Sequence, residues 1–145
     1  MALSVNLSAK TEYACIAVLE LALRHEQGEP VRIRNIADNH GIPSRFLVQI
    51  LLQLKGAGLV TSTRGASGGY QLAKTPRKIT LEDVMNVIEG RVADVQSNAD
   101  DTPVTQALHA VWQQANDVER ELLRSVTFAD LAKNVGEQSD SMYYI

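Results

Sequence analysis

The residues with the clearest chemical potential lie between Arg64 and Lys74, in the segment RGASGGYQLAK. Three glycines, an alanine and a serine leave it almost without side-chain bulk, as in loops that bind a phosphate or turn tightly between two strands. A nucleotide-binding P-loop requires Gly-Lys-Ser/Thr at the start of a helix, so that backbone amides and the lysine reach the phosphates. Here Gly68 and Gly69 precede Tyr70 and a strand-like run. We therefore predict a hairpin turn rather than a nucleotide site.

The histidines, serines and acids show no spacing that catalysis requires. His25, His40 and His109 lie far apart in the sequence and outside the patterns of zinc proteases and deaminases, and no Gly-x-Ser-x-Gly nucleophile elbow occurs. Glu82 and Asp83 are adjacent carboxylates, but they begin a predicted helix, where the positive end of the helix dipole explains them. We therefore predict that the protein is not an enzyme.

The composition is that of an ordinary globular protein about one domain in size. Of the 145 residues, 45% are hydrophobic and 21% are charged, with no apolar run long enough to span a membrane and no signal-peptide pattern. The single cysteine, Cys15, excludes an internal disulfide and a cysteine-rich zinc site. Its apolar neighbours in the sequence favour a small buried side chain over a redox role. We expect a cytoplasmic protein without a membrane partner.

Charge is distributed unevenly along the chain. The whole sequence has a net charge of −3, but the 51 residues from Pro30 to Thr80 hold eight basic residues and one acid, a net charge of +7. The remaining 94 residues therefore carry −10. A basic central third between acidic ends is typical of a surface that binds a polyanion, although a chance excess of solvated lysines and arginines gives the same count.

Helical periodicity predicts a first helix over residues 9–25 and a helix-turn-helix after it. Ser8 is available as the N-cap of the first helix, which Gly28 and Pro30 end. The next two helices are short and meet at a turn through Gly41, a pattern typical of a helix-turn-helix. The apolar faces that we expect to pack inward are Ile33, Ile36 and Ala37 in the first of these and Phe46, Leu47, Ile50, Leu51 and Leu54 in the second.

A hairpin and another helix follow the helix-turn-helix. Residues 59–63 (LVTST) and 70–74 (YQLAK) are β-branched or alternating runs on either side of the glycine loop, so we predict two antiparallel strands. Thr80 is the expected cap of a helix that runs to about Glu89. Residues 97–102 form a polar connector to the next helix.

A long helix is predicted from Pro103, which is tolerated in a first helical turn. Apolar residues recur along it at spacings of four and three, the heptad period that lets helices supercoil on a partner. Because the seam is short, an amphipathic helix packed within one chain gives the same pattern. Residues 126–131 (VTFADL) are expected to begin a short last helix, with a frayed end from Gly136. The candidate dimerisation residues are Val104, Leu108, Val111, Ala115, Val118 and Leu122.

The helix-turn-helix and the hairpin together favour a DNA-binding surface. A helix fits the major groove with residues near its N-terminus at the base edges, while a neighbouring loop contacts the backbone. Arg45 suits a guanine edge or a phosphate, and Gln49 can form a bidentate pair with adenine. Arg64 can approach DNA closely because its neighbours in the loop are small. The candidate DNA-binding residues are Arg34, Ser44, Arg45, Gln49, Arg64, Ser67, Gly68, Arg77 and Lys78.

The first helix, the helix-turn-helix and the segments KGAGLVTSTRGASGGYQLAK, ITLEDVMNVIEG and VTFADL together resemble the bacterial Rrf-two winged-helix regulators over about residues 7–132. That family includes the iron–sulfur-cluster regulator, the nitric-oxide-sensing repressor and the cysteine-metabolism repressor. The resemblance implies a homodimer in which the long C-terminal helices pack together and the hairpins, or wings, bind palindromic DNA.

The chain departs from the family at the positions that hold iron. The resemblance implies three cysteine ligands between the fourth helix and the long helix, whereas residues 91–106 contain no cysteine. Glu12 and His109 match ligand positions of some members, but we interpret them as remnants or structural residues, because iron–sulfur clusters need thiolates. Val48 stands where many members have glutamate, which puts the family's known operators in doubt here. We therefore predict no metal and no cofactor.

The expected fold is mostly α with a small β-hairpin. Residues 1–80 are predicted to form a winged helix-turn-helix DNA-binding domain, and residues 81–102 a connecting helix and loop. Residues 103–135 would form the dimerisation and terminal helices, followed by a tail at residues 136–145.

The function that these features favour is that of a transcriptional repressor that binds a pseudo-palindromic operator on double-stranded DNA as a homodimer. Its signal stays open between a small-molecule effector in the cleft between the domains and a regulatory protein partner. The alternative is a protein-interaction module of the same fold that regulates a partner enzyme without binding DNA. Salt-dependent binding to duplex DNA distinguishes the two functions.

Overall fold

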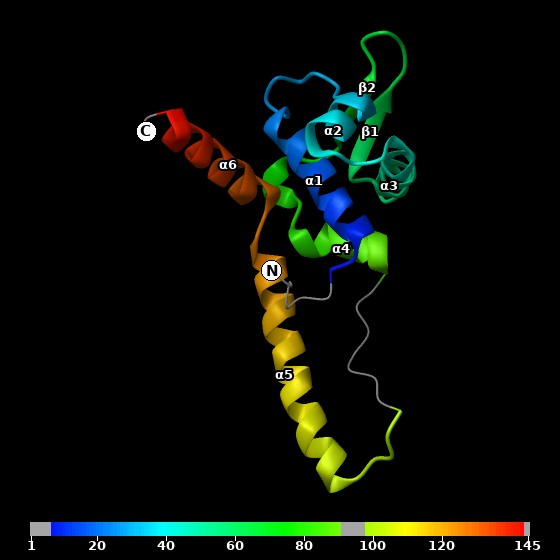
Figure 1. The fold of residues 1–145 in the computed structure, drawn as a ribbon, viewed down its shortest axis with the longest axis vertical. Helices are drawn as coiled ribbons and strands as arrows, with labels where there is room; N and C mark the ends of the chain where they lie inside the picture. Colours follow the sequence, from blue (N-terminus) through cyan, green and yellow to red (C-terminus); the bar gives the residue numbers. More distant parts are fainter. Residues whose placement is uncertain (1–6, 91–97, 144–145) are drawn as a thin grey trace.

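The computed structural model describes residues 7–90 and 98–143, with side chains up to residue 138. Figure 1 shows a body of helices and a hairpin, from which the long helix α5 projects downward and the last helix α6 extends to the upper left. The mostly α architecture with a small β-hairpin is confirmed. In chain order the elements are α1 (Ala9–Leu23), α2 (Ile33–His40), α3 (Ser44–Gly56), β1 (Val60–Thr63), β2 (Gly69–Leu72), the 3-10 turn η1 (Pro76–Lys78), α4 (Leu81–Glu89), α5 (Pro103–Ser125) and α6 (Phe128–Tyr143).

Helix α1 is the centre of the body and contacts α3, α4, α6 and β2. Ser8 is its N-cap, as predicted, since the Ser8 hydroxyl oxygen accepts a hydrogen bond from the Thr11 backbone N–H at 3.1 Å. Thr11 is fully buried, and its hydroxyl donates to the Glu89 carboxylate at 2.6 Å, which joins α1 to the end of α4. The apolar side chains that α1 buries are Ala14, Ala17, Val18, Leu21 and Ala22.

Helices α2 and α3 form the predicted helix-turn-helix. Gly41 ends α2 with a φ of 64°, a left-handed conformation that glycine adopts without strain. Phe46 does not pack inward as expected: it is 41% exposed, because it lies beside the arc of buried residues that begins at Leu47. Its ring centroid lies 6.3 Å from that of Tyr13 on α1. The fully buried residues of α3 are Leu47, Ile50, Leu51 and Leu54.

Strands β1 and β2 form the predicted antiparallel hairpin, with Val60 opposite Leu72. The second strand ends at Leu72 rather than at Lys74. Val31, which follows α1, adds a third segment to the hairpin, because Val31 and Tyr70 exchange two backbone hydrogen bonds of 2.8 and 2.9 Å. A single bridging residue has no alternating pattern, so the sequence could not predict this pairing.

The joint between α5 and α6 is fastened to the start of α4. Thr80 caps α4, as predicted, and forms a capping box with Asp83. The backbone N–H of Phe128 donates to the Ile79 carbonyl at 2.9 Å, directly before this cap. The Phe128 ring is fully buried in the core. Phe128 therefore anchors the base of α5 and the first turn of α6 to the body.

The last helix is longer than the sequence predicts. The expected short helix with a frayed end from Gly136 is wrong, because α6 continues through Gly136 to Tyr143. Its first turns pack on the core through Leu131 and Ala132. Glu137 and Gln138 favour helix beyond this contact, and one glycine within a helix costs only about 1 kcal/mol. Within the described ranges, no helix has the length and apolar character needed to cross a membrane.

Candidate nucleic-acid interface

Helix α3 turns one face to the core and the opposite face to solvent. Its buried leucines and isoleucine recur at helical spacing, so the residues half a turn away point outward. Arg45 and Gln49, four residues apart, form one outward row, and Val48 and Leu52 form the adjacent row. Ser44 is exposed in the first turn. The outward face thus combines hydrogen-bonding and apolar side chains within reach of one another.

The surface of α3 is positively charged and is joined to the hairpin. The Arg45 guanidinium lies over the ring of Phe46, with 5.0 Å between the guanidinium carbon and the ring centroid. Lys55 adds a second positive charge near the end of the helix, and α3 contains no acidic residue. The Lys55 ammonium donates a hydrogen bond of 2.7 Å to the Ser62 hydroxyl on β1. This bond couples the end of α3 to the hairpin.

A side-chain contact holds the end of α2 against α1. Nε2 of His40 lies 2.7 Å from Oε1 of Glu20, directly before the turn at Gly41. The contact therefore helps to fix the direction in which α3 leaves the turn. Arg34 is exposed near the start of α2, on the element that precedes α3.

The wing consists of β1, the loop at residues 64–68 and β2. Gly68 is buried, and a Cβ atom at this position would overlap the Thr63 carbonyl oxygen. A Cβ atom on Gly69 would lie 2.5 Å from the Val31 carbonyl oxygen. Both glycines are therefore required by the shape of the wing and by its pairing with Val31. Gly68 supports the interface from within and offers no surface to a ligand.

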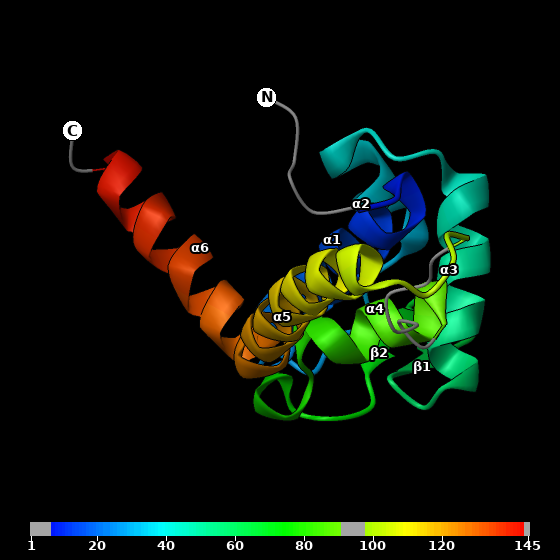
Figure 2. The same cartoon turned by 90° about the horizontal axis from the view of Figure 1, so that it is seen from below.

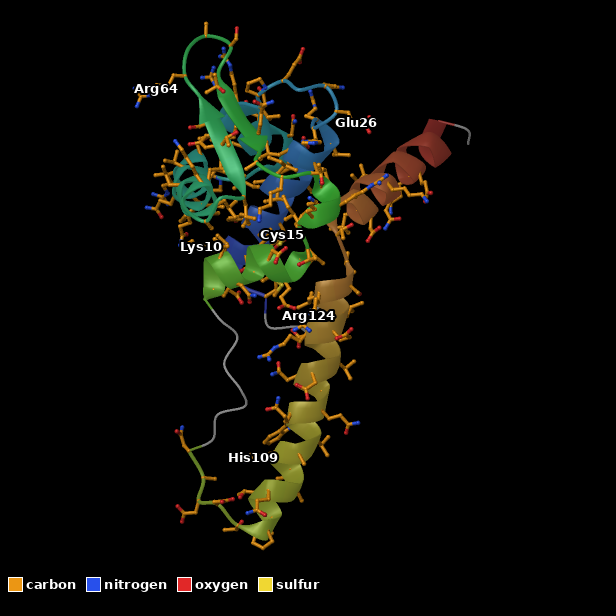
Figure 3. All side chains as sticks on the ribbon, turned by 180° about the vertical axis from the view of Figure 1, so that it is seen from behind. Lys10, Cys15, Glu26, Arg64, His109 and Arg124 are labelled. Carbon is orange, nitrogen blue, oxygen red and sulfur yellow. The ribbon has the colours of Figure 1, made fainter. Side chains whose placement is uncertain are left out.

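Arg64 and Ser67 are both exposed at the tip of the wing. Figure 3 shows the Arg64 side chain extending away from the wing, toward the side of the molecule on which α3 lies. The neighbouring Gly65 has a φ of 105°, a conformation that few other residues adopt. Arg64 and helix α3 thus lie on the same side of the body (Figure 3).

Arg77 and Lys78 lie elsewhere. They belong to η1, which Figures 1 and 2 place beside the start of α6, on the opposite side of α1 from α3. Arg77 lines an open groove of about 1010 Å³ between the end of α1 and the start of α6, together with His25 and Lys133. Within one chain, the structure does not bring these two predicted DNA contacts to α3.

Helix α5 extends away from the body without a buried residue along its 23 positions. The exposed fractions reach 71% at Val104 and 61% at Leu122, the two ends of the predicted seam. At its base, Nε of Arg124 lies 3.2 Å from Oε2 of Glu82 on α4. All the predicted dimerisation residues are exposed: Val104, Leu108, Val111, Ala115, Val118 and Leu122.

The two residues that match metal-ligand positions are not brought together. Glu12 belongs to the first turn of α1 in the body, whereas His109 lies on the projecting part of α5 (Figure 3). The His109 ring instead faces Trp112, with 5.8 Å between the ring centroids. Among the residues that the structure describes, no three His, Cys, Asp or Glu side chains gather to hold a metal ion.

Cys15 is half-buried and packs against the core. Burial, and then the negative charges of Glu89 and Glu12, raise the pKa of the Cys15 thiol to about 11. The thiolate is the form that binds metals and reacts with oxidants, so the side chain is inert near neutral pH. An iron–sulfur cluster requires several thiolates, and the chain has one cysteine. The donor set of this chain therefore does not fit such a cluster.

The sequence reasoning missed Leu52 as part of the outward face. Leu52 is 56% exposed, although it lies between two buried positions of the same helix, Leu51 and Leu54. The signal was its spacing of four residues from Val48, which puts the two residues in one row outside the buried face.

Comparison with known proteins relates this arrangement to bacterial transcription regulators. The sequence profile of the Rrf2 family, described as iron-dependent transcriptional regulator, matches residues 7–134. The HTH-type transcriptional regulator CymR of Bacillus subtilis is 37% identical over 142 residues, which cover 97% of this chain and all of CymR. The HTH-type transcriptional regulator IscR of Vibrio campbellii is 32% identical over 133 residues, 90% of this chain and 79% of that protein.

Solved structures show the same relationship. The structure of CymR, the global cysteine regulator of B. subtilis, matches with a TM-score of 0.80 and 35% identity, covering 90% of this chain and 98% of CymR. The structure of T. potens IscR matches with a TM-score of 0.77 and 34% identity, covering 93% of this chain and 91% of that protein.

Proposed function

The chain belongs to the Rrf2 family of transcriptional regulators, and we propose that it acts in the bacterial cytoplasm as a homodimeric repressor that binds a pseudo-palindromic operator. The observation that carries this proposal is the outward face of α3, where Arg45 and Gln49 form one exposed row, on the helix toward whose side Arg64 of the wing extends. Arginine and glutamine recognise guanine and adenine edges in the major groove, and arginine on a loop contacts phosphates.

The charge distribution supports a nucleic-acid partner. Residues 30–74, which contain α2, α3 and the wing, hold six basic residues and one acid, a net charge of +5. The acidic remainder of the chain includes α5. This separation directs the positive side of the protein toward the phosphates of DNA.

The exposed seam of α5 supports dimerisation. Most of the stability of a helix in a protein comes from packing of its amphipathic face, and no residue of α5 is buried. Packing two such seams together would cover the apolar residues of both helices by knobs-into-holes contacts. A symmetric dimer would present two α3 helices to successive major grooves about 34 Å apart, which calls for a pseudo-palindromic site.

We further propose that the dimer represses transcription and that its regulation uses no iron–sulfur cluster. A dimer that covers two successive grooves would block a promoter by occupying it. Regulation would not use an iron–sulfur cluster, because Cys15 is the one cysteine of the sequence and its thiol is held protonated. The signal would instead be a small-molecule effector or a regulatory protein.

Duplex DNA binding as a function of salt tests this function. We expect the affinity for genomic fragments to fall by about a thousandfold between low and physiological salt, because the bound phosphates release counterions. The variant R45A/R64A should bind more weakly and show a smaller dependence on salt. K133A, which removes an exposed positive charge from α6, is the matched control and should leave both unchanged. Failure to bind any duplex at low salt would refute DNA binding and favour the protein-interaction module.

A further inference from the structure

Two apolar side chains stand on the otherwise polar and basic outward face of α3. Val48 is 42% exposed and Leu52 is 56% exposed. They are four residues apart, so they form one continuous row along the helix. Outside α5, the other large apolar side chains that the described part of the chain exposes are Leu23 and Phe46.

Neither residue of this row has a role in the core. The buried core cluster includes Leu47 and Leu51 of α3. Neither Val48 nor Leu52 belongs to this cluster or to the partly buried side chains packed against it. Phe46 differs from them, because its ring faces Tyr13 and is covered by the Arg45 guanidinium. The Val48–Leu52 row is therefore available to a ligand.

The row is interleaved with the hydrogen-bonding row of the same face. Val48 lies three residues after Arg45, and Leu52 lies three residues after Gln49, so each apolar side chain neighbours one polar side chain. In the major groove, hydrogen-bonding base edges likewise lie next to one apolar group, the 5-methyl group of thymine.

We propose that Val48 and Leu52 contact thymine 5-methyl groups and so select A·T pairs beside the bases that Arg45 and Gln49 recognise. The proposal rests on the DNA-binding function proposed above. Van der Waals contact with a methyl group needs an apolar side chain that projects from the recognition helix without competing for hydrogen bonds, and valine and leucine meet this need.

The size and charge of the surroundings favour DNA over a protein partner. A stable protein interface buries more than about 1,000 Å² in total, whereas this row consists of two side chains on one helix. The row lies on a helix with Arg45 and Lys55 and without an acid, on the side to which Arg64 extends. A phosphate-lined groove matches this environment.

The test replaces thymine by deoxyuridine, which pairs identically but lacks the methyl group. The probe is a duplex of about 40 base pairs selected from a randomised library by the full-length protein, long enough for two half-sites. Each thymine in a half-site is replaced in turn, and affinity is measured by fluorescence anisotropy. At one or two positions per half-site we expect a loss of about fourfold for the single methyl, and roughly fifteenfold when both half-sites are changed.

The variants V48A and L52A assign the effect to side chains. Each should weaken binding to the thymine probe and reduce the loss caused by deoxyuridine at its own position. L23A is the matched control, because Leu23 is 37% exposed on α1 and lies outside α3. It should retain the full sensitivity to deoxyuridine. Circular dichroism of each variant verifies that the fold is retained.

The outcomes separate this inference from the proposed function. Tight, salt-dependent binding without any effect of deoxyuridine would overturn the methyl contact and leave the DNA-binding function intact. Unchanged sensitivity in both V48A and L52A would also overturn it, since other residues would then contact the methyl groups. Unaltered DNA affinity in V48A/L52A, together with loss of a bound protein, would mean that the row docks a protein. Absence of any selected duplex would refute the proposed function itself.

Discussion

The body and the projecting helix α5 carry the same type of apolar periodicity but differ in what covers it. In the body, the core-facing leucines and isoleucine of α3 are completely buried, with 0% exposure at Leu47, Ile50 and Leu54. In α5, the corresponding face is exposed, up to 71% at Val104. One helix is packed by its own chain, whereas no residue of the other is buried in the part of the chain that the structure describes.

The difference shows that amphipathic spacing identifies a face to be covered and does not identify the covering surface. The contacts of α1 with α3, α4, α6 and β2 complete the core of the body. Among the described residues, helix α5 is fastened to the body at its base, where Phe128 follows it into the core and Arg124 contacts Glu82. The body should therefore fold without a second chain, whereas α5 should require one.

The largest effect is expected from charges placed in the α5 seam. V111E/V118E should convert the dimer to a monomer, because two buried carboxylates would face their symmetry mates, and the loss of bivalent binding should reduce operator affinity by about a hundredfold or more. Sedimentation and anisotropy measure the two effects. Q106E/Q113E adds the same charge to the opposite face and should remain dimeric. If both variants were monomeric, the seam would be no more important for dimerisation than the opposite face of α5, and the prediction would be wrong.

A smaller effect is expected from the thiol of Cys15, which reports on the packing of the body. Its pKa is raised in the folded protein to about 11, so folding favours the neutral thiol. The resulting stability is complete below about pH 9 and is lost as pH rises through 11. Between these limits the free energy of unfolding should fall by about 2 kcal/mol more in the natural protein than in C15A. Equal pH profiles in urea denaturation would mean that Cys15 is open to water.

The smallest effect is expected at the wing. R64A should weaken binding to every duplex by about tenfold while leaving the preferred sequence unchanged, because a phosphate contact carries no sequence information. R45A provides the contrast, since it should relax the preference at one base pair. Comparison of the sequences that each variant selects measures both. A changed preference in R64A would show that the wing contacts bases directly.

Local patterns predicted most of the elements of the body because the signals act over a few residues. Ser8 and Thr80 cap their helices, and Gly41 adopts the left-handed conformation of the turn. The end of the chain was predicted poorly, because Gly136 was interpreted as the end of a helix that in fact passes through it. A helix can tolerate one glycine when the residues on both sides favour helix.

The exposure of the candidate interface residues could be predicted where helical periodicity determines it. It could not be predicted where it depends on packing against other elements. Ser44, Arg45 and Gln49 are exposed on α3, as their phase against the buried leucines requires. Phe46 was predicted to face the core, but the surroundings of its ring depend on other helices, including Tyr13 of α1. Arg77 was grouped with α3 from charge alone, although η1 lies beside α6.

By itself the sequence determined the helix-turn-helix, the glycine-rich wing, the basic central third and the lack of cluster thiolates, because caps, periodicity, charge and cysteine content are local or compositional properties. Only the tertiary structure decided that Gly68 is buried within the wing, that Arg77 lies away from α3 and that the seam of α5 stays exposed among the residues that the structure describes. Those features depend on which distant segments meet, and that is settled by the shared core around α1 rather than by any one segment.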